Sequence, residues 1–248
     1  MALVWQQFTR HKHYQVRRAG ASTRLYTDGV FHSQFNPNHP LNGSIWDLLV
    51  LPALFAPRDI HRILILGLGG GAVVRTIEKI LPGRDITAVE IDPVHIRIAK
   101  TYFGVSTNRQ TKVIQADAAV WLAHYQGDKF DFILDDLFIG AEGAPSRAVN
   151  ADQNWCNLLL KHLSSKGVLA INFDSNKALR NSTLAKQFKG SQALASGFTL
   201  SCPGYENRIV AFFKTVQQPE KLNRTLRELA ACHGKPFIRK IKARVRRL

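Results

Sequence analysis

Cysteine, methionine and long apolar runs are scarce in this sequence of 248 residues. The three cysteines, Cys156, Cys202 and Cys232, are too widely spaced to suggest a disulfide framework or a Cys-x-x-Cys motif. The nine histidines are scattered, so we expect no metal site. The longest apolar runs, at 48–56 and 63–68, are much shorter than the ~18 residues of a membrane-spanning helix. With no secretory signal at the start of the chain, these absences predict a cytoplasmic protein.

Acidic residues are also few, with 18 against 34 lysines and arginines and a formal net charge of +16. This charge favours an anionic partner such as nucleic acid, acidic lipid or an acidic protein. Residues 235–248 contain seven basic residues and no acidic one, and their apolar residues recur at helical spacing. We therefore expect a basic tail that forms a helix and contacts polyanions or an acidic membrane surface. A solvated, frayed end is the alternative.

The pattern of the sequence divides the chain into three regions. Residues 1–42 carry short alternating runs with turn signals at Ala19-Gly20 and Asp28-Gly29, which predict a small β-hairpin region. Residues 43–216 begin with an apolar helix and continue with alternating apolar strands and amphipathic helices. Residues 217–248 contain one further helix and the basic tail.

The central region predicts an α/β fold. We expect strands at 63–66, 86–89, 112–115, 130–135, 168–173, 199–202 and 209–213, and helices at 72–80, 93–102, 118–125, 152–163 and 220–231. Alternating units of this kind form a Rossmann-like, doubly wound and mainly parallel sheet with helices on both faces.

Glycines follow the first of these strands and open a helix, at Gly67, Gly69, Gly70 and Gly71. Missing side chains let a ligand approach the backbone closely. Glu90 ends the next strand 23 residues after Gly67, near the ~20-residue offset at which an acidic side chain can bind ribose hydroxyls. The glycine loop and Glu90 together therefore predict a nucleoside-binding site. The alternative is a tight turn with Glu90 as a helix cap.

Two further strand ends carry carboxylates. Asp117 follows the third strand and can accept a hydrogen bond from an adenine amino group, or cap the next helix. Asp135 and Asp136 end the fourth strand, and strand alternation points their side chains in opposite directions. We expect Asp136 to face the cleft, where it can act on the transferred group, and Asp135 to face a helix or solvent.

At these residues the chain resembles the spermidine synthase family of polyamine aminopropyltransferases and the related AdoMet-dependent methyltransferase-like proteins. The resemblance covers roughly residues 22–215 and includes the motifs at 25–30, 89–92, 116–118 and 130–143, besides the glycine loop. It implies a class I methyltransferase-type sheet of seven strands behind an N-terminal β-hairpin domain, and assembly into dimers. It also implies roles for site residues. Glu90 would hold the ribose, Asp117 and Ala118 the adenine, and Asp136 would be the catalytic aspartate beside the donor. The glycine loop and Ile91 would also bind the cofactor.

The chain departs from the family at four places that bind the polyamine or the donor. Gly70 stands where the family's glycine loop has an acidic residue that contacts the aminopropyl amine, and Ile139 replaces a second aspartate. His32 replaces a glutamine, and residues 45–47 replace a tyrosine-histidine-glutamate segment. Each change removes a partner for a multiply charged amine. We expect His32 and Asp135 to be the remaining candidates on the substrate side.

Three functions follow as hypotheses. The first is a transferase that moves an aminopropyl or related alkyl group from AdoMet or decarboxylated AdoMet to an amine-type small-molecule acceptor, without a metal and with a degenerate polyamine site. The second is a methyltransferase that uses ordinary AdoMet, because the missing acid at Gly70 leaves room for the methionine carboxylate. The third is a noncatalytic nucleoside-binding module, because fold alone does not establish activity.

Overall fold

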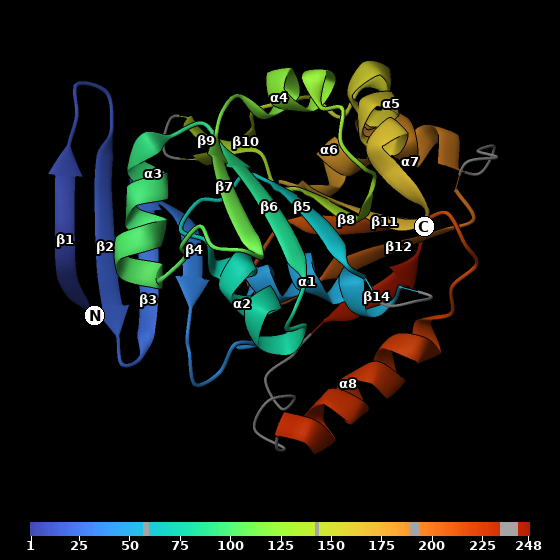
Figure 1. Ribbon diagram of the computed structural model, residues 1–248, viewed down its shortest axis with the longest axis horizontal. Helices are drawn as coiled ribbons and strands as arrows, with labels where there is room; N and C mark the ends of the chain where they lie inside the picture. Colours follow the sequence, from blue (N-terminus) through green and yellow to red (C-terminus); the bar gives the residue numbers. More distant parts are fainter. Residues whose placement is uncertain (57–59, 142–143, 189–193, 234–242) are drawn as a thin grey trace.

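The protein, seen in a computed structural model that describes residues 1–56, 60–141, 144–188, 194–233 and 243–248, contains two main sheets (Figure 1). A four-stranded antiparallel sheet at the N-terminus lies beside a mixed eight-stranded sheet with helices on both faces. The predicted α/β doubly wound sheet is confirmed. No helix in the described ranges combines the length and apolar character needed to cross a bilayer.

The elements have the following bounds. The strands are β1 (Ala2–Phe8), β2 (His13–Ala19), β3 (Ser22–Thr27), β4 (Val30–Phe35), β5 (Arg62–Leu66), β6 (Asp85–Glu90), β7 (Thr111–Gln115), β8 (Phe130–Asp135), β9 (Phe138–Ala141), β10 (Ala144–Arg147), β11 (Leu163–Phe173), β12 (Ser196–Ser201), β13 (Arg208–Phe213) and β14 (Arg244–Arg247). The helices are α1 (Ile45–Leu54), α2 (Ala72–Ile80), α3 (Pro93–Ile98) with the π-helical turn η1 (Ala99–Phe103), α4 (Ala118–His124), α5 (Gln153–His162), α6 (Asn176–Asn181), α7 (Thr183–Gln187) and α8 (Pro219–His233).

The N-terminal region forms four antiparallel strands in the order β1-β2-β3-β4, rather than a single hairpin. The β3–β4 turn consists of Asp28 and Gly29, both with positive φ (51° and 78°), as the tightest hairpin turns require. Tyr14 of β2 donates a hydrogen bond to Asp92 at the start of α3 (2.8 Å), and Thr27 of β3 pairs with His95 of α3 (2.8 Å). These contacts place the small sheet against the carboxyl edge of the large one.

The large sheet has the strand order β14-β12-β13-β11-β8-β5-β6-β7. The strands β11, β8, β5, β6 and β7 are mutually parallel, so their carboxyl ends meet at one edge. Along β5, Ile63 and Ile65 pack into one hydrophobic core and Leu64 and Leu66 into the other. Helices α1 and α2 contribute to the first core, and α4 and α5 to the second. Burial on both faces explains why the central strands are continuous apolar runs.

The basic tail differs from the helix predicted for it. Residues 244–247 form β14, which pairs antiparallel with β12, and Val245 packs against the core. The helical prediction is wrong for these residues, because pairing satisfies the backbone groups that β12 would otherwise expose at the sheet edge. Most of the remaining tail, 235–242, lies outside the described residues, and its contact with polyanions stays a prediction. The expected helix at 220–231 is confirmed as α8.

Candidate functional site

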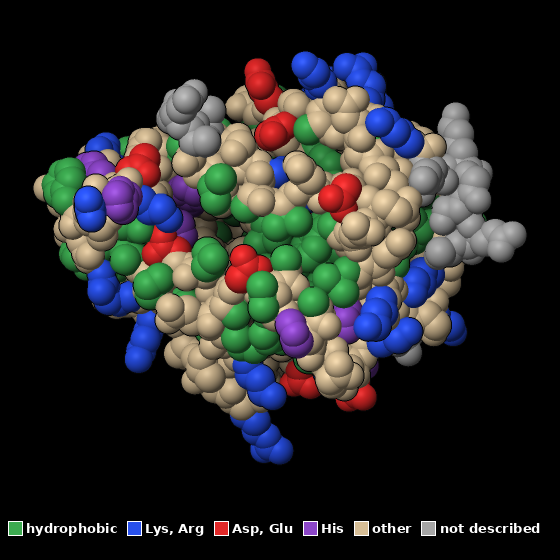
Figure 2. Space-filling model, turned by 90° about the horizontal axis from the view of Figure 1, so that it is seen from above, with side chains coloured by type: hydrophobic (Ala, Val, Ile, Leu, Met, Phe, Trp, Pro, Cys, Tyr) green, Lys and Arg blue, Asp and Glu red, His purple; other side chains and the backbone are tan. Residues whose placement is uncertain are grey.

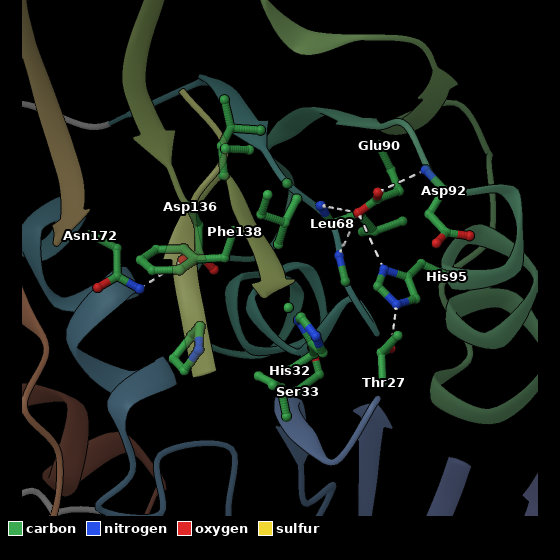
Figure 3. A pocket seen from close by; sticks show the side chains of 18 of the residues that line it. Thr27, His32, Ser33, Leu68, Glu90, Asp92, His95, Asp136, Phe138 and Asn172 are labelled. Carbon is green, nitrogen blue, oxygen red and sulfur yellow. Dashed lines mark hydrogen bonds and ion pairs between the residues drawn. The ribbon is translucent and has the colours of Figure 1, made fainter. Parts of the chain in front are cut away.

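A cavity of about 500 Å³ lies between the carboxyl ends of the parallel strands and the N-terminal sheet (Figure 3). Glu90 at the end of β6, Asp117 after β7 and Asp136 after β8 all line it. Strand β4 and helix α1 line the opposite side, and β9, β10 and the segments after β10 and β12 complete it. Carboxylates from three different strand ends therefore share one cavity, as open α/β sheets commonly arrange their ligand sites.

The glycine loop runs closely past the end of β8. A Cβ atom on Gly67, whose φ is +92°, would lie 2.3 Å from the backbone oxygen of Asp136, so only glycine fits. Gly67 and Gly69 line the cavity, whereas Gly70 and Gly71 face the protein interior, where a Cβ atom would meet Phe103 or Val105. The loop thus holds two glycines for the cavity and two for packing.

We expect Gly67→Ala to lower the free energy of unfolding by about 3 kcal/mol or more, because backbone strain and a backbone clash add. Gly83→Ala is the matched control, since Gly83 also has positive φ (+78°) but its Cβ atom would meet nothing within 4 Å. The control should lose only about 1–2 kcal/mol. Urea denaturation measures both values, and equal losses would contradict the close approach at Gly67.

Glu90 connects the glycine loop to the start of α3. Its Oε2 accepts hydrogen bonds from the backbone N–H groups of Leu68 (3.1 Å) and Gly69 (2.9 Å), and its Oε1 accepts one from Asp92 (2.9 Å). Burial raises the pKa of the Glu90 carboxyl, and these backbone bonds oppose that rise. Glu90 is 8% exposed and that surface faces the cavity, so the side chain both organises the loop and presents oxygen atoms to a ligand.

Asp117 is a helix cap that also lines the cavity. Its Oδ1 accepts hydrogen bonds from the backbone N–H groups of Ala119 (2.8 Å) and Val120 (3.0 Å) at the start of α4. The side chain is exposed, and neighbouring Ala118 lines the cavity with it. Ile91 lines the same part of the cavity and is 61% exposed. Capping and ligand contact are therefore compatible at Asp117.

Asp136 lies in a strongly perturbing environment. Burial, strengthened by nearby Asp135, raises its pKa to about 7, although the hydrogen bond from Asn172 opposes the rise. Asn172 Nδ2 donates to Asp136 Oδ1 (2.7 Å), and Asn207 Nδ2 in turn donates to Asn172 Oδ1 (3.1 Å). A carboxyl that titrates near neutral pH is suited to accept a proton during a reaction. Neither asparagine was predicted from the sequence, although Asn172 lies within the expected strand at 168–173.

Asp135 lies behind the cavity and does not line it. It is fully buried, and its Oδ2 accepts hydrogen bonds from Arg147 (2.7 Å) and from Trp155 Nε1 (2.8 Å). Strand alternation had predicted opposite directions for the two aspartates, and the side chains do point apart. Asp135 therefore does not lie on the substrate side, where the sequence had suggested it as a candidate. Its hydrogen bonds with Arg147 and Trp155 give it a role in stabilising the fold.

His32 lines the cavity from β4. Burial, followed by the nearby His95, lowers the pKa of its imidazole to about 4, and the two rings lie 5.3 Å apart. The His32 ring is therefore neutral at pH 7. Its Nε2 atom is buried and has no hydrogen-bond partner in the described part of the chain.

The cavity is acidic although the chain is strongly basic. Five carboxylates line it, from Asp28, Glu90, Asp92, Asp117 and Asp136. The one lining ammonium group among the described residues, that of Lys12, pairs with Asp92 at 2.8 Å. On the face shown in Figure 2, lysines and arginines lie mostly toward the outline of the molecule. The described residues contain no cluster of three or more His, Cys, Asp and Glu that could hold a metal ion. The charge of the cavity suits a cationic ligand.

Known proteins resemble this chain in sequence. The chain is 39% identical over 128 residues to a polyamine aminopropyltransferase of Vibrio vulnificus. The aligned region covers 51% of this chain and 42% of that protein. It is 26% identical over 171 residues to an eEF1A lysine and N-terminal methyltransferase homolog of Drosophila melanogaster, which covers 64% and 24% of the two chains. The chain therefore spans less than half the length of these curated relatives.

The fold is also shared with a solved structure. The crystal structure of a probable spermidine synthase from Corynebacterium glutamicum has a TM-score of 0.75 at 17% identity, covering 100% of this chain and 91% of that one. This likeness confirms the predicted class of fold. The family profile of the spermine/spermidine synthase domain matches residues 47–224. Because the match covers most of the sequence and agrees with the strand order and the cavity, the chain belongs to the spermine/spermidine synthase family.

Proposed function

We propose that this protein is a transferase that binds an adenosyl sulfonium at the ends of β5, β6 and β7 and passes its alkyl group to an amine beside Asp136. The observation that carries the proposal is the meeting of Glu90, Asp117 and Asp136 in one cavity. Glu90 would accept hydrogen bonds from the ribose hydroxyls and Asp117 from the adenine amino group.

The charge of the cavity supports a cationic donor and acceptor. A sulfonium and an ammonium each lose water on binding, and nearby carboxylates compensate this cost. The related Vibrio vulnificus protein is named a polyamine aminopropyltransferase, and polyamines are cations at neutral pH.

The reaction that fits these groups is a displacement at the carbon beside the sulfur. The Asp136 carboxylate first takes a proton from the acceptor ammonium, which frees the nitrogen lone pair. That lone pair then forms the new N–C bond while the C–S bond breaks, and the electron pair of the C–S bond leaves with the sulfur as a neutral thioether. The pKa of about 7 allows Asp136 to take up that proton and release it to solvent between turnovers.

A methyltransferase reaction with ordinary AdoMet is the second candidate. A Cβ atom on Gly70 would lie 2.7 Å from the ring of Phe103 and 2.8 Å from Ser33 Cβ, so the loop has no room for the acidic residue that the family uses for the aminopropyl amine. The Drosophila melanogaster relative is named as a methyltransferase homolog. The choice of donor therefore decides between two transferases that share one site.

Calorimetry with AdoMet, decarboxylated AdoMet and methylthioadenosine tests the proposal. We expect at least one of them to bind with a Kd of about 100 μM or tighter, in the usual range for enzyme substrates. Glu90→Gln should weaken this binding at least ~10-fold, because an amide N–H would face the backbone donors of the glycine loop. Asp85→Asn, at the opposite end of β6, is the control and should not change it. Absence of binding by all three ligands would refute the proposed function.

A further inference from the structure

The two halves of the cavity differ in chemistry. The sheet order places the ends of β6 and β7 on one side of β5, and the ends of β8 and β11 on the other. Figure 3 accordingly shows Glu90, Asp92 and His95 on one side of the cavity and Asp136 and Asn172 on the other. We call these the donor half, at the ends of β6 and β7 and the β3–β4 turn, and the acceptor half, at the ends of β8 and β11, with β9, Phe31 of β4, Trp46 of α1 and the loop before β13.

The acidic side chains are concentrated in the donor half. Glu90, Asp92 and Asp117 follow β6 and β7, and Asp28 lies in the β3–β4 turn, next to Thr27, which pairs with His95. Among the described residues of the acceptor half that line the cavity, Asp136 carries the one carboxylate, because Glu206 in the loop before β13 is exposed and does not line it. Its other polar side chains are neutral.

Apolar and aromatic side chains make up most of the acceptor half. They come from β4, α1, β9 and the loop before β13, namely Phe31, Trp46, Phe138, Ile139 and Tyr205. The rings form a continuous row, with 4.6 Å between the centroids of Phe31 and Trp46 and 6.4 Å between those of Trp46 and Tyr205. Ile139 is 49% exposed and lies three residues after Asp136. A ligand that reaches past Asp136 therefore meets hydrocarbon.

Asp136 is engaged by one amine when the acceptor binds. A second ammonium farther along the same ligand would lose water against aromatic and aliphatic side chains, with no second carboxylate among the described lining residues of the acceptor half to compensate. The amide groups of Asn172 and Asn207 are already bonded to Asp136 and to each other. The acceptor half therefore favours a ligand whose part beyond the reacting amine is uncharged, and it disfavours a ligand with a second charge there.

We infer that the acceptor is a monoamine with an apolar or aromatic body, rather than a diamine or polyamine. The inference rests on the proposed function, because it takes the Asp136 end of the cavity as the place where the acceptor amine reacts. It identifies the class of substrate through the side chains that surround that amine.

The test compares n-hexylamine with 1,6-diaminohexane, which differ only in a terminal ammonium. Each amine is titrated by calorimetry into protein saturated with methylthioadenosine, so that binding is measured without turnover. We expect n-hexylamine to bind at least ~10-fold more tightly, because the diamine has an unpaired charge in the acceptor half. Equal binding, tighter binding of the diamine, or no binding of either amine would overturn the inference.

Ile139→Asp provides a gain-of-charge test. The new carboxylate should improve the affinity for 1,6-diaminohexane relative to n-hexylamine by at least ~10-fold. Val216→Asp, which also replaces a highly exposed apolar residue but lies outside the cavity, should leave the ratio unchanged. Glu142 lies outside the described residues, so Glu142→Gln is measured in parallel, and a marked loss of diamine affinity in that variant would also overturn the inference.

The result is separable from the proposed function. If no adenosyl ligand binds, the proposed function fails before any amine is added. If adenosyl ligands bind and 1,6-diaminohexane is preferred, the transferase proposal stands and the monoamine inference is wrong.

Discussion

Asp136→Asn is expected to reduce turnover by at least about 100-fold while the affinity for the adenosyl donor changes only severalfold. The amide keeps an oxygen that can accept the hydrogen bond from Asn172 Nδ2, so the local geometry should persist. It cannot take up the proton that the acceptor nitrogen releases. Single-turnover measurements with mass-spectrometric detection of the product separate this chemical step from binding.

The pH dependence gives a second signature of the same carboxyl. Because burial raises the pKa of Asp136 to about 7, the carboxylate is mostly protonated at pH 6 and mostly ionised at pH 8. Only the ionised form accepts a proton, so the single-turnover rate of the wild type should rise with pH across this window. The Asp136→Asn variant should lose the part of the pH profile centred near 7.

The raised pKa also has a consequence for stability. The folded state binds a proton at Asp136 between about pH 4 and about pH 7, where the unfolded chain has already released it. The contribution of this group to the free energy of unfolding therefore decreases as pH rises through that window.

The control for the kinetic experiment on Asp136→Asn is Asp85→Asn, which removes an exposed carboxylate far from the cavity and should leave turnover unchanged. Turnover of Asp136→Asn close to wild type would remove this residue from the mechanism.

Arg147→Met should lower the free energy of unfolding by about 3–5 kcal/mol, the usual cost of leaving one partner of a buried ion pair without the other. Asp135 is fully buried and Arg147 is 7% exposed, and they lie 2.7 Å apart. Arg147 also donates to the backbone oxygen of Asn172 (2.6 Å). Removing the guanidinium thus leaves both a carboxylate and a carbonyl without this partner. Urea denaturation at pH 7 measures the loss.

The double variant Asp135→Asn/Arg147→Met is the internal control. The amide that replaces the Asp135 carboxylate is uncharged, so the penalty for an unpaired buried charge disappears and part of the stability should return. An additive loss from the two substitutions would show that the pair does not interact as the structure places it. A loss below about 1 kcal/mol for Arg147→Met, the value typical of exposed pairs, would likewise contradict a buried ion pair.

Most of the α/β core can be predicted from the sequence. The apolar runs that became β5, β6 and β8 are buried on both faces, and this leaves a signal that needs no knowledge of the fold. The glycine loop after β5 and the acidic residue at the end of β6 also have local signatures, because steric limits and chain direction constrain them. These features were enough to predict the sheet and three of the five carboxylates that line the cavity, those of Glu90, Asp117 and Asp136.

Features that depend on contacts between residues distant in sequence could not be predicted and are seen only in the tertiary structure. Apolar spacing at the C-terminus fits a helix or a strand, and the free edge of β12 selected the strand β14. No local pattern shows that Arg147 pairs with Asp135, or that Asn207 bonds to Asn172, which in turn bonds to Asp136. The aromatic row of the acceptor half likewise combines residues from separate elements. Such contacts arise from packing between segments, and the energy that selects them exists only once the chain has folded.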